Sequence, residues 1–82
     1  MKHTDKKISD EILEMLMRRD AGKTICPSEV ARALFPDNWR DEMGHVRSVT
    51  KELVKSGKIV ITQGGEVLDP ENFEGPIRLR LL

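Results

Sequence analysis

A first helix is predicted by apolar residues that recur at helical spacing near the start of the chain: Ile8, Ile12, Leu13, Leu16 and Met17. Ser9 is the expected N-cap, with Thr4 as an earlier alternative start. Gly22 follows the basic end of this segment and is expected to close the helix in the left-handed conformation. Residues 1–7 are expected to be an irregular N-terminus.

A second, short helix is predicted from Pro27 to Phe35. Proline fits the first position of a helix because its missing N–H has no helical partner there. The residues that give this helix an apolar side are Val30, Ala31 and Leu34. The turn residues at 36–38 are expected to end it and to join it closely to the next helix.

The third predicted helix is the longest. Asn38 followed by Asp41 resembles a capping box, which marks the start, and Gly57 marks the end. Its expected buried residues are Met43, Val46, Val49, Leu53 and Val54.

Beyond the third helix the apolar period changes to two residues, which indicates strands. Residues 59–62 alternate in this way, and the pair Gly64-Gly65 predicts a tight hairpin turn into residues 66–68. Residues 77–81 alternate apolar and basic positions, as expected of an antiparallel strand with one exposed face. Residues 24–26 are long enough only for a single strand bridge.

This order of elements predicts one α+β domain spanning residues 1–82, because 82 residues leave no room for a second domain. Three helices plus a C-terminal antiparallel β-hairpin wing are typical of a winged helix-turn-helix. The apolar face of the predicted sheet has only the helices to pack against. A three-helix bundle with an appended hairpin is the alternative architecture.

Composition narrows the class of protein. The chain has 14 Lys and Arg residues against 14 Asp and Glu residues, so it has no global basic field. Its single cysteine, Cys26, has no partner for an internal disulfide, and the residues after Met1 are polar rather than a secretory signal. No apolar run approaches the roughly 20 residues that cross a bilayer. We expect a soluble cytoplasmic protein with no membrane partner.

Distinctive segments are spread over most of the chain: residues 22–34 (GKTICPSEVARAL), 39–40, 46–47, 57–59, 61–63, 69–70 and 75–80. In combination they resemble the bacterial family catalogued as Domain of Unknown Function 3253. This resemblance implies a winged-helix fold in a bacterial cytoplasm. It implies no activity and no catalytic or binding residues.

The candidate functional surface is a basic stripe along one side of the third helix. Residues spaced by three or four positions share a helix side, and the second helix of a helix-turn-helix enters the major groove of DNA. Arg and Lys side chains there can meet phosphates or guanine edges. The predicted nucleic-acid-binding residues, including three that extend the patch towards the wing, are Arg40, Arg47, Ser48, Lys51, Lys55, Lys58, Arg78 and Arg80.

Two observations keep an alternative open. Residues 40–58 contain five basic and three acidic residues, a modest excess that a solvated helix side would also show. Asp41 and Glu42 stand where base edges would approach the helix.

The expected function is duplex-DNA binding with a transcription-related role, by a monomer or weak homodimer. The alternative is a winged-helix protein–protein interaction module that binds no nucleic acid.

Catalytic chemistry has little support in the sequence. Gly22-Lys23-Thr24 resembles the end of a phosphate-binding loop, but Met17 stands where the motif needs glycine. Cys26 precedes a helix, yet neither histidine offers it an evident base, and one cysteine with two histidines falls short of a zinc site. Trp39 is expected to pack near the core rather than on a base. We expect no enzyme activity, no cofactor and no metal.

Overall fold

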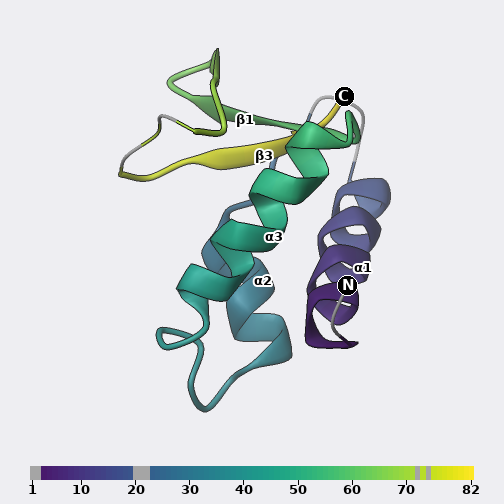
Figure 1. Cartoon of the computed structure of the whole chain (residues 1–82), viewed down its shortest axis with the longest axis vertical. Helices are drawn as coiled ribbons and strands as arrows, with labels where there is room; N and C mark the ends of the chain where they lie inside the picture. Colours follow the sequence, from purple (N-terminus) through teal and green to yellow (C-terminus); the bar gives the residue numbers. More distant parts are fainter. Residues whose placement is uncertain (1–2, 20–22, 72, 74) are drawn as a thin grey trace.

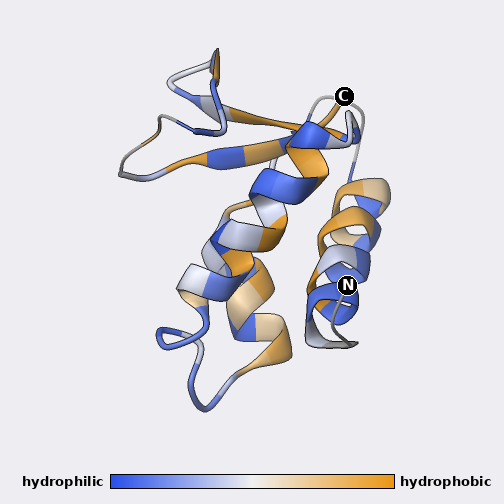
Figure 2. Cartoon of the chain, viewed as in Figure 1, coloured by the Kyte–Doolittle hydropathy of each residue, from blue (hydrophilic) through white to orange (hydrophobic). Residues whose placement is uncertain are grey.

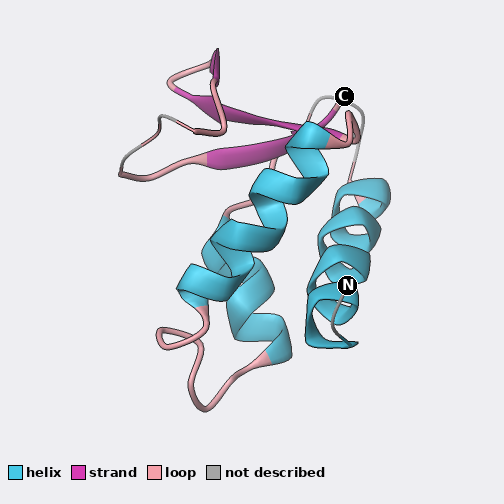
Figure 3. Cartoon of the chain, in the orientation of Figure 1, coloured by secondary structure: helices cyan, strands magenta, loops and turns pink. Residues whose placement is uncertain are grey.

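Three helices precede three strands in the computed structural model, which describes residues 3–19, 23–71, 73 and 75–82 (Figure 1). The elements are α1 (His3–Arg18), α2 (Pro27–Leu34), α3 (Met43–Lys55), β1 (Ile59–Gln63), β2 (Glu66–Leu68) and β3 (Arg78–Leu81). The helices stand beside one another, and the sheet lies across one end of them (Figure 3). The predicted α+β class is confirmed, in an arrangement consistent with a winged helix. In the described part of the chain, no helix combines the length and the apolar character needed to cross a membrane.

The strands form one antiparallel sheet in the order β2-β1-β3. Gly64 and Gly65 both have positive φ, at 59° and 86°, as the predicted two-residue hairpin turn requires. Ile25 adds an isolated antiparallel bridge to Leu79, with N–H···O distances of 3.0 and 2.7 Å. The hairpin and the single bridge at residues 24–26 are therefore confirmed.

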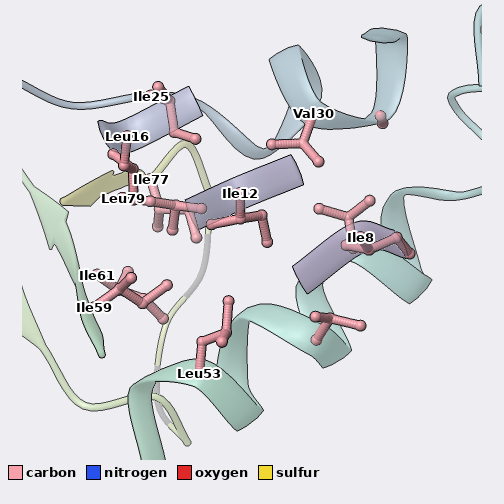
Figure 4. Packing of buried hydrophobic residues seen from close by; sticks show 13 residues of the cluster. Ile8, Ile12, Leu16, Ile25, Val30, Leu53, Ile59, Ile61, Ile77 and Leu79 are labelled. Atoms are coloured by element: carbon pink, nitrogen blue, oxygen red, sulfur yellow. The ribbon is translucent and has the colours of Figure 1, made fainter. Parts of the chain in front are cut away.

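The core lies where the inner face of the sheet meets the three helices (Figure 4). Its largest buried side chains come from α1, from the residues around α2 and from the strands, and they include Ile8, Ile12, Ile25, Val30, Ile59, Ile61 and Leu79. Because the sheet supplies so much of this core, the alternative of a three-helix bundle with an appended hairpin is wrong. The one fully buried hydroxyl on α3, that of Thr50, donates to the carbonyl of Val46 at 2.9 Å.

Helix α1 differs from its prediction at the start and along one side. It begins at His3, so the irregular N-terminus predicted for residues 1–7 is wrong for residues 3–7. Met17, which the spacing places on the apolar face of the first helix, is 73% exposed. At about 100° per residue, Met17 stands roughly 140° around the helix from Ile12, the centre of the buried stripe. The predicted closure at Gly22 lies outside the described residues.

Helix α3 begins later than predicted. Its N-cap is Glu42 rather than Asn38, and residues 36–42 form turns instead of a first helical turn. Within these turns, the amides of Asp41 and Glu42 each donate to a carbonyl three residues earlier, at 3.0 and 3.2 Å. The tighter winding places Arg40 before the helix rather than on it.

The end of α3 follows the prediction. Gly57 has a φ of 75°, and its amide donates to the carbonyl of Val54 at 3.0 Å. The amide of Lys58 reaches back to the carbonyl of Leu53 at 3.1 Å. These two bonds form a Schellman motif, which turns the chain from α3 into β1.

An ionic contact joins the start of α1 to the start of α3. His45 Nε2 is hydrogen-bonded to the carboxylate of Asp5, and His45 Nδ1 lies 3.4 Å from Glu42 Oε2. The hydrogen bond to Asp5, the largest cause, and the carboxylate of Glu42 together raise the pKa of His45 above its ordinary value of 6.5. The contact is therefore strongest when His45 is protonated.

Substitution by alanine of Gly44, within α3, and of Gly57, just after it, is expected to change stability in opposite directions. Gly57→Ala forces alanine into the left-handed conformation and should destabilise the protein by about 1 kcal/mol. Gly44→Ala adds a methyl group to a helical position with nothing within 4 Å, and should stabilise the protein by about 0.5–1 kcal/mol. Urea unfolding followed by circular dichroism measures both. Equal stabilities for the two variants would contradict the assigned end of α3.

The Asp5–His45–Glu42 contact predicts a pH-dependent stability. The pKa of His45 is higher in the folded protein than its ordinary value of about 6.5 in the unfolded chain. The contribution of His45 to the free energy of unfolding is therefore complete below this unfolded pKa, and it is lost as the pH rises through the folded pKa. The free energy of unfolding of the wild type should exceed that of His45→Gln most between about pH 5 and 6, where both carboxylates remain ionised. A difference that stays constant from pH 5 to about 8.5 would refute this assignment.

Candidate nucleic-acid-binding face

The middle of α3 presents two cations that share one aromatic ring. The side chains of Arg47 and Lys51 each lie 5.7 Å from the centroid of Phe73, which comes from the segment between β2 and β3. Both cations are half-buried, while Ser48 beside them is exposed. The residues on the solvent side of α3 and in the α2–α3 turn are largely hydrophilic (Figure 2). Arg47, Ser48 and Lys51 lie on α3, as the helical spacing predicts, and the two cations have an aromatic contact that the spacing did not reveal.

The next cation along α3 has an acidic partner. Lys55 Nζ lies 2.9 Å from Glu71 Oε1, and both side chains are more than half exposed. This hydrogen bond lowers the pKa of Glu71 and raises the pKa of Lys55. The amide of Glu71 donates to Asp69 Oδ1 at 2.9 Å, which orients its backbone. Glu71 and Phe73 therefore both reach α3 from the β2–β3 segment.

A second aromatic ring holds cations at the α2–α3 turn. The guanidinium carbons of Arg32 and Arg40 lie 4.3 and 4.6 Å from the ring centroid of Trp39. Trp39 is half-buried and packs against the core, as predicted, whereas both arginines are exposed. Arg32 was absent from the predicted site because no other basic residue on α2 forms a pattern with it.

Two sets of cations in the described chain differ in what holds them, and Lys7, whose Nζ lies 5.8 Å from the ring centroid of Phe35, is a further cation on a ring. Lys6, Arg18, Arg19 and Lys55 each pair with a carboxylate at 2.6–2.9 Å. The four cations on the two aromatic rings are Arg32, Arg40, Arg47 and Lys51. No acidic residue in the described ranges forms an ion pair with any of these four. An aromatic ring rather than a carboxylate therefore holds each of these charges, although the charge of Lys51 also acts on Glu71 and helps to lower the pKa of that carboxyl group.

The acidic residues expected to oppose DNA lie in the turns before α3. Glu42 contacts the His45 ring, and Asp41 is exposed. These acidic residues lie at the start of α3, while Arg47 and Lys51 lie roughly 1.5 and 2.5 helical turns further along than Glu42.

The predicted wing residues are not brought together with the α3 cations. Leu79 points into the core, so the alternation of β3 turns Arg78 and Arg80 to the opposite face of the sheet. Arg78 Nε donates to Thr24 Oγ1 at 2.9 Å, and Arg78 Nη1 donates to Cys26 Sγ at 2.8 Å. Arg80 is half-buried on the same face.

The remaining basic position and the neighbouring cysteine have structural contacts. Lys58 is exposed at the corner between α3 and β1, and its carbonyl accepts the amide of Leu82 at 3.2 Å. Cys26 is the N-cap of α2, and its amide donates to Glu29 Oε1 at 3.1 Å. Glu29 Oε2 also pairs with Arg19 at 2.6 Å, which ties the end of α1 to the start of α2.

A comparison with curated proteins found no match to this chain. The model of the family described as "Protein of unknown function (DUF3253)" matches residues 5–82, which include all three strands and nearly all of the helices. The chain therefore belongs to the DUF3253 family.

Proposed function

We propose that this protein binds duplex DNA through the exposed side of α3, with α3 directed into the major groove. The observation that carries the proposal is the pair Arg47 and Lys51, which rest on the ring of Phe73 and have no acidic partner among the described residues. Ser48, exposed beside them, adds a hydroxyl that can donate to a phosphate.

An aromatic ring suits this role because it restrains a cation without neutralising it. Cation–π contacts at exposed sites contribute about 0.5–1 kcal/mol, enough to bias the side-chain conformation. Phosphate binding by such cations releases counterions, which supplies most of nonspecific DNA affinity. A helix such as α3 also fits the major groove, which is about 12 Å wide.

The ion pair between Lys55 and Glu71 limits what Lys55 can contribute to DNA binding. Glu71 places a carboxylate where a phosphate would otherwise meet Lys55. In this arrangement Lys55 contributes to DNA binding only after it exchanges Glu71 for a phosphate. Arg78 and Arg80 lie on the opposite face of the sheet from the core. Their predicted contact with DNA is therefore separate from the contact made by α3.

The wider role is part of the proposal. Binding by a monomer or weak homodimer would be weak and nonspecific at physiological salt, unless a DNA sequence adds base contacts. The proposal includes a transcription-related role and a location in the compartment that holds the DNA, which in a bacterial cell is the cytoplasm.

A protein-interaction module is the second candidate function. It is favoured by the net charge of zero and by Val67, which is 58% exposed on the short strand β2. Edge strands with exposed apolar side chains are recurrent sites of strand pairing between chains. Failure to bind DNA at low salt would favour this candidate.

Removal of the two ring-held cations of α3 should weaken DNA binding. We expect the Arg47→Gln/Lys51→Gln variant to reduce the slope of log affinity against log salt by about two, since each phosphate contact contributes roughly 0.9. Fluorescence anisotropy of a labelled random-sequence duplex, between about 50 and 200 mM salt, measures the slope.

The matched control for this experiment is Lys6→Gln/Arg18→Gln, which removes the same charge from ion pairs on α1. Its salt slope should stay close to that of the wild type. If both double variants lose affinity equally, only net charge matters and α3 is not the binding face.

Release of Lys55 should strengthen the same binding. We expect Glu71→Gln to raise affinity several-fold at low salt and to increase the salt slope by about one, because Lys55 becomes available to a phosphate. Glu14→Gln is the control, since it releases Arg18 from a similar exposed pair on α1. Unchanged affinity in Glu71→Gln would show that Lys55 lies outside the interface.

A further inference from the structure

We propose that Arg32 and Arg40, held by Trp39, form a second phosphate-binding site, which anchors the DNA backbone at the α2–α3 turn. This inference rests on the proposed function, and it adds two residues, Arg32 and Trp39, that the sequence did not assign to the site. Trp39 is a positioning residue in this proposal, because it holds the two guanidinium groups rather than the DNA.

The geometry of the cluster brings two like charges together. The guanidinium carbons lie 4.3 and 4.6 Å from one ring centroid, so the two positive charges are at most the sum of these distances apart. Like charges separated by about one Debye length or less repel each other, and salt weakens this repulsion. An anion that contacts both arginines would relieve this repulsion.

No group of the described chain plays the part of that anion. Asp37 and Asp41 are exposed and close in sequence, yet neither forms an ion pair with Arg32 or Arg40. By contrast, Arg18 and Arg19 on α1 or just after it are both paired with glutamates. Among the described residues, no side-chain hydrogen bond or ion pair occupies the guanidinium donors of Arg32 and Arg40, so these donors can bind an anion from outside.

The position of the cluster favours a nucleic-acid backbone. The α2–α3 turn lies at the end of α3 opposite the sheet (Figure 1), so Arg40 precedes the α3 cations along the direction of the helix. A duplex whose groove receives α3 carries phosphates on both sides of that groove. The planar guanidinium suits such a ligand because it can donate two parallel hydrogen bonds to phosphate oxygens.

Intrinsic fluorescence gives a direct readout of this site. Trp39 is the only tryptophan, and the chain has no tyrosine, so the ultraviolet emission reports on this ring alone. Addition of a random-sequence duplex at low salt should change the Trp39 emission. The midpoint of this change should equal that of the anisotropy of the labelled duplex.

Variants of Arg32 separate the charge from the shape of the guanidinium. Arg32→Gln should reduce the salt slope of binding by about one and greatly diminish the emission change. Arg32→Lys keeps the charge, so it should keep the slope while binding more weakly. Arg18→Gln is the matched control, an arginine lost from an exposed position on α1, and should behave as the wild type.

Variants of Trp39 test its positioning role by anisotropy. Trp39→Leu keeps both arginines but removes their ring, so it should lower affinity with little change in slope. Trp39→Phe restores a ring and should recover affinity. Urea unfolding of both variants shows whether they remain folded at the temperature of the titration. If Trp39→Phe binds no better than an equally stable Trp39→Leu, the ring does not position the arginines.

Three further outcomes would overturn the inference in distinguishable ways. If the wild type binds no duplex at low salt, the proposed function and this inference both fail. If the wild type binds through Arg47 and Lys51 while Arg32→Gln keeps the full slope, only the second site is refuted. If poly-glutamate changes the Trp39 emission at a salt concentration where the duplex does not, the cluster binds acidic protein instead of phosphate.

Discussion

The apolar inner face of the sheet must be kept from water, and the positions of the three helices follow from that requirement. Ile59, Ile61 and Leu79 are almost fully buried, and side chains from α1 and the region around α2 complete their surroundings. Because α3 uses Val46, Val49 and Leu53 for the same core, its opposite side is left in water. The polar side of α3 is thus a consequence of how the sheet is covered, and its cations are presented by a rigid support.

The sequence predicted the elements whose apolar residues recur at regular spacing or whose ends are marked by glycine. Strand alternation and the pair Gly64-Gly65 identified the hairpin, and Gly57 identified the end of α3, because each depends on a local backbone preference. The start of α3 was not predictable in the same way, since Asn38 and Asp41 suit turns as well as helix caps. Met17 was misplaced because the apolar stripe is centred on Ile8, Ile12 and Leu16.

The contacts of the candidate site were beyond the reach of sequence patterns for a different reason. Phe73 and Lys51 are more than twenty residues apart, and only the turn of the chain after β2 brings them together. Glu71 and Lys55 are 16 residues apart, and the same turn of the chain brings them together. Helical spacing identified which cations share a side of α3. It carried no information on whether a carboxylate or an aromatic ring would lie against each of them, which decides how much charge remains available.

The bridge between Ile25 and Leu79 has a consequence for how the chain reaches this structure. Its two backbone hydrogen bonds join residues that are 54 positions apart, and they hold the segment that leads directly into α2. Closing so long a loop has a substantial entropic penalty, and contacts of this kind slow folding relative to helical bundles of equal size. The bridge can form only after the chain has been synthesised beyond residue 79. On a ribosome, the start of α2 therefore cannot be joined to β3 until that point of translation has been passed.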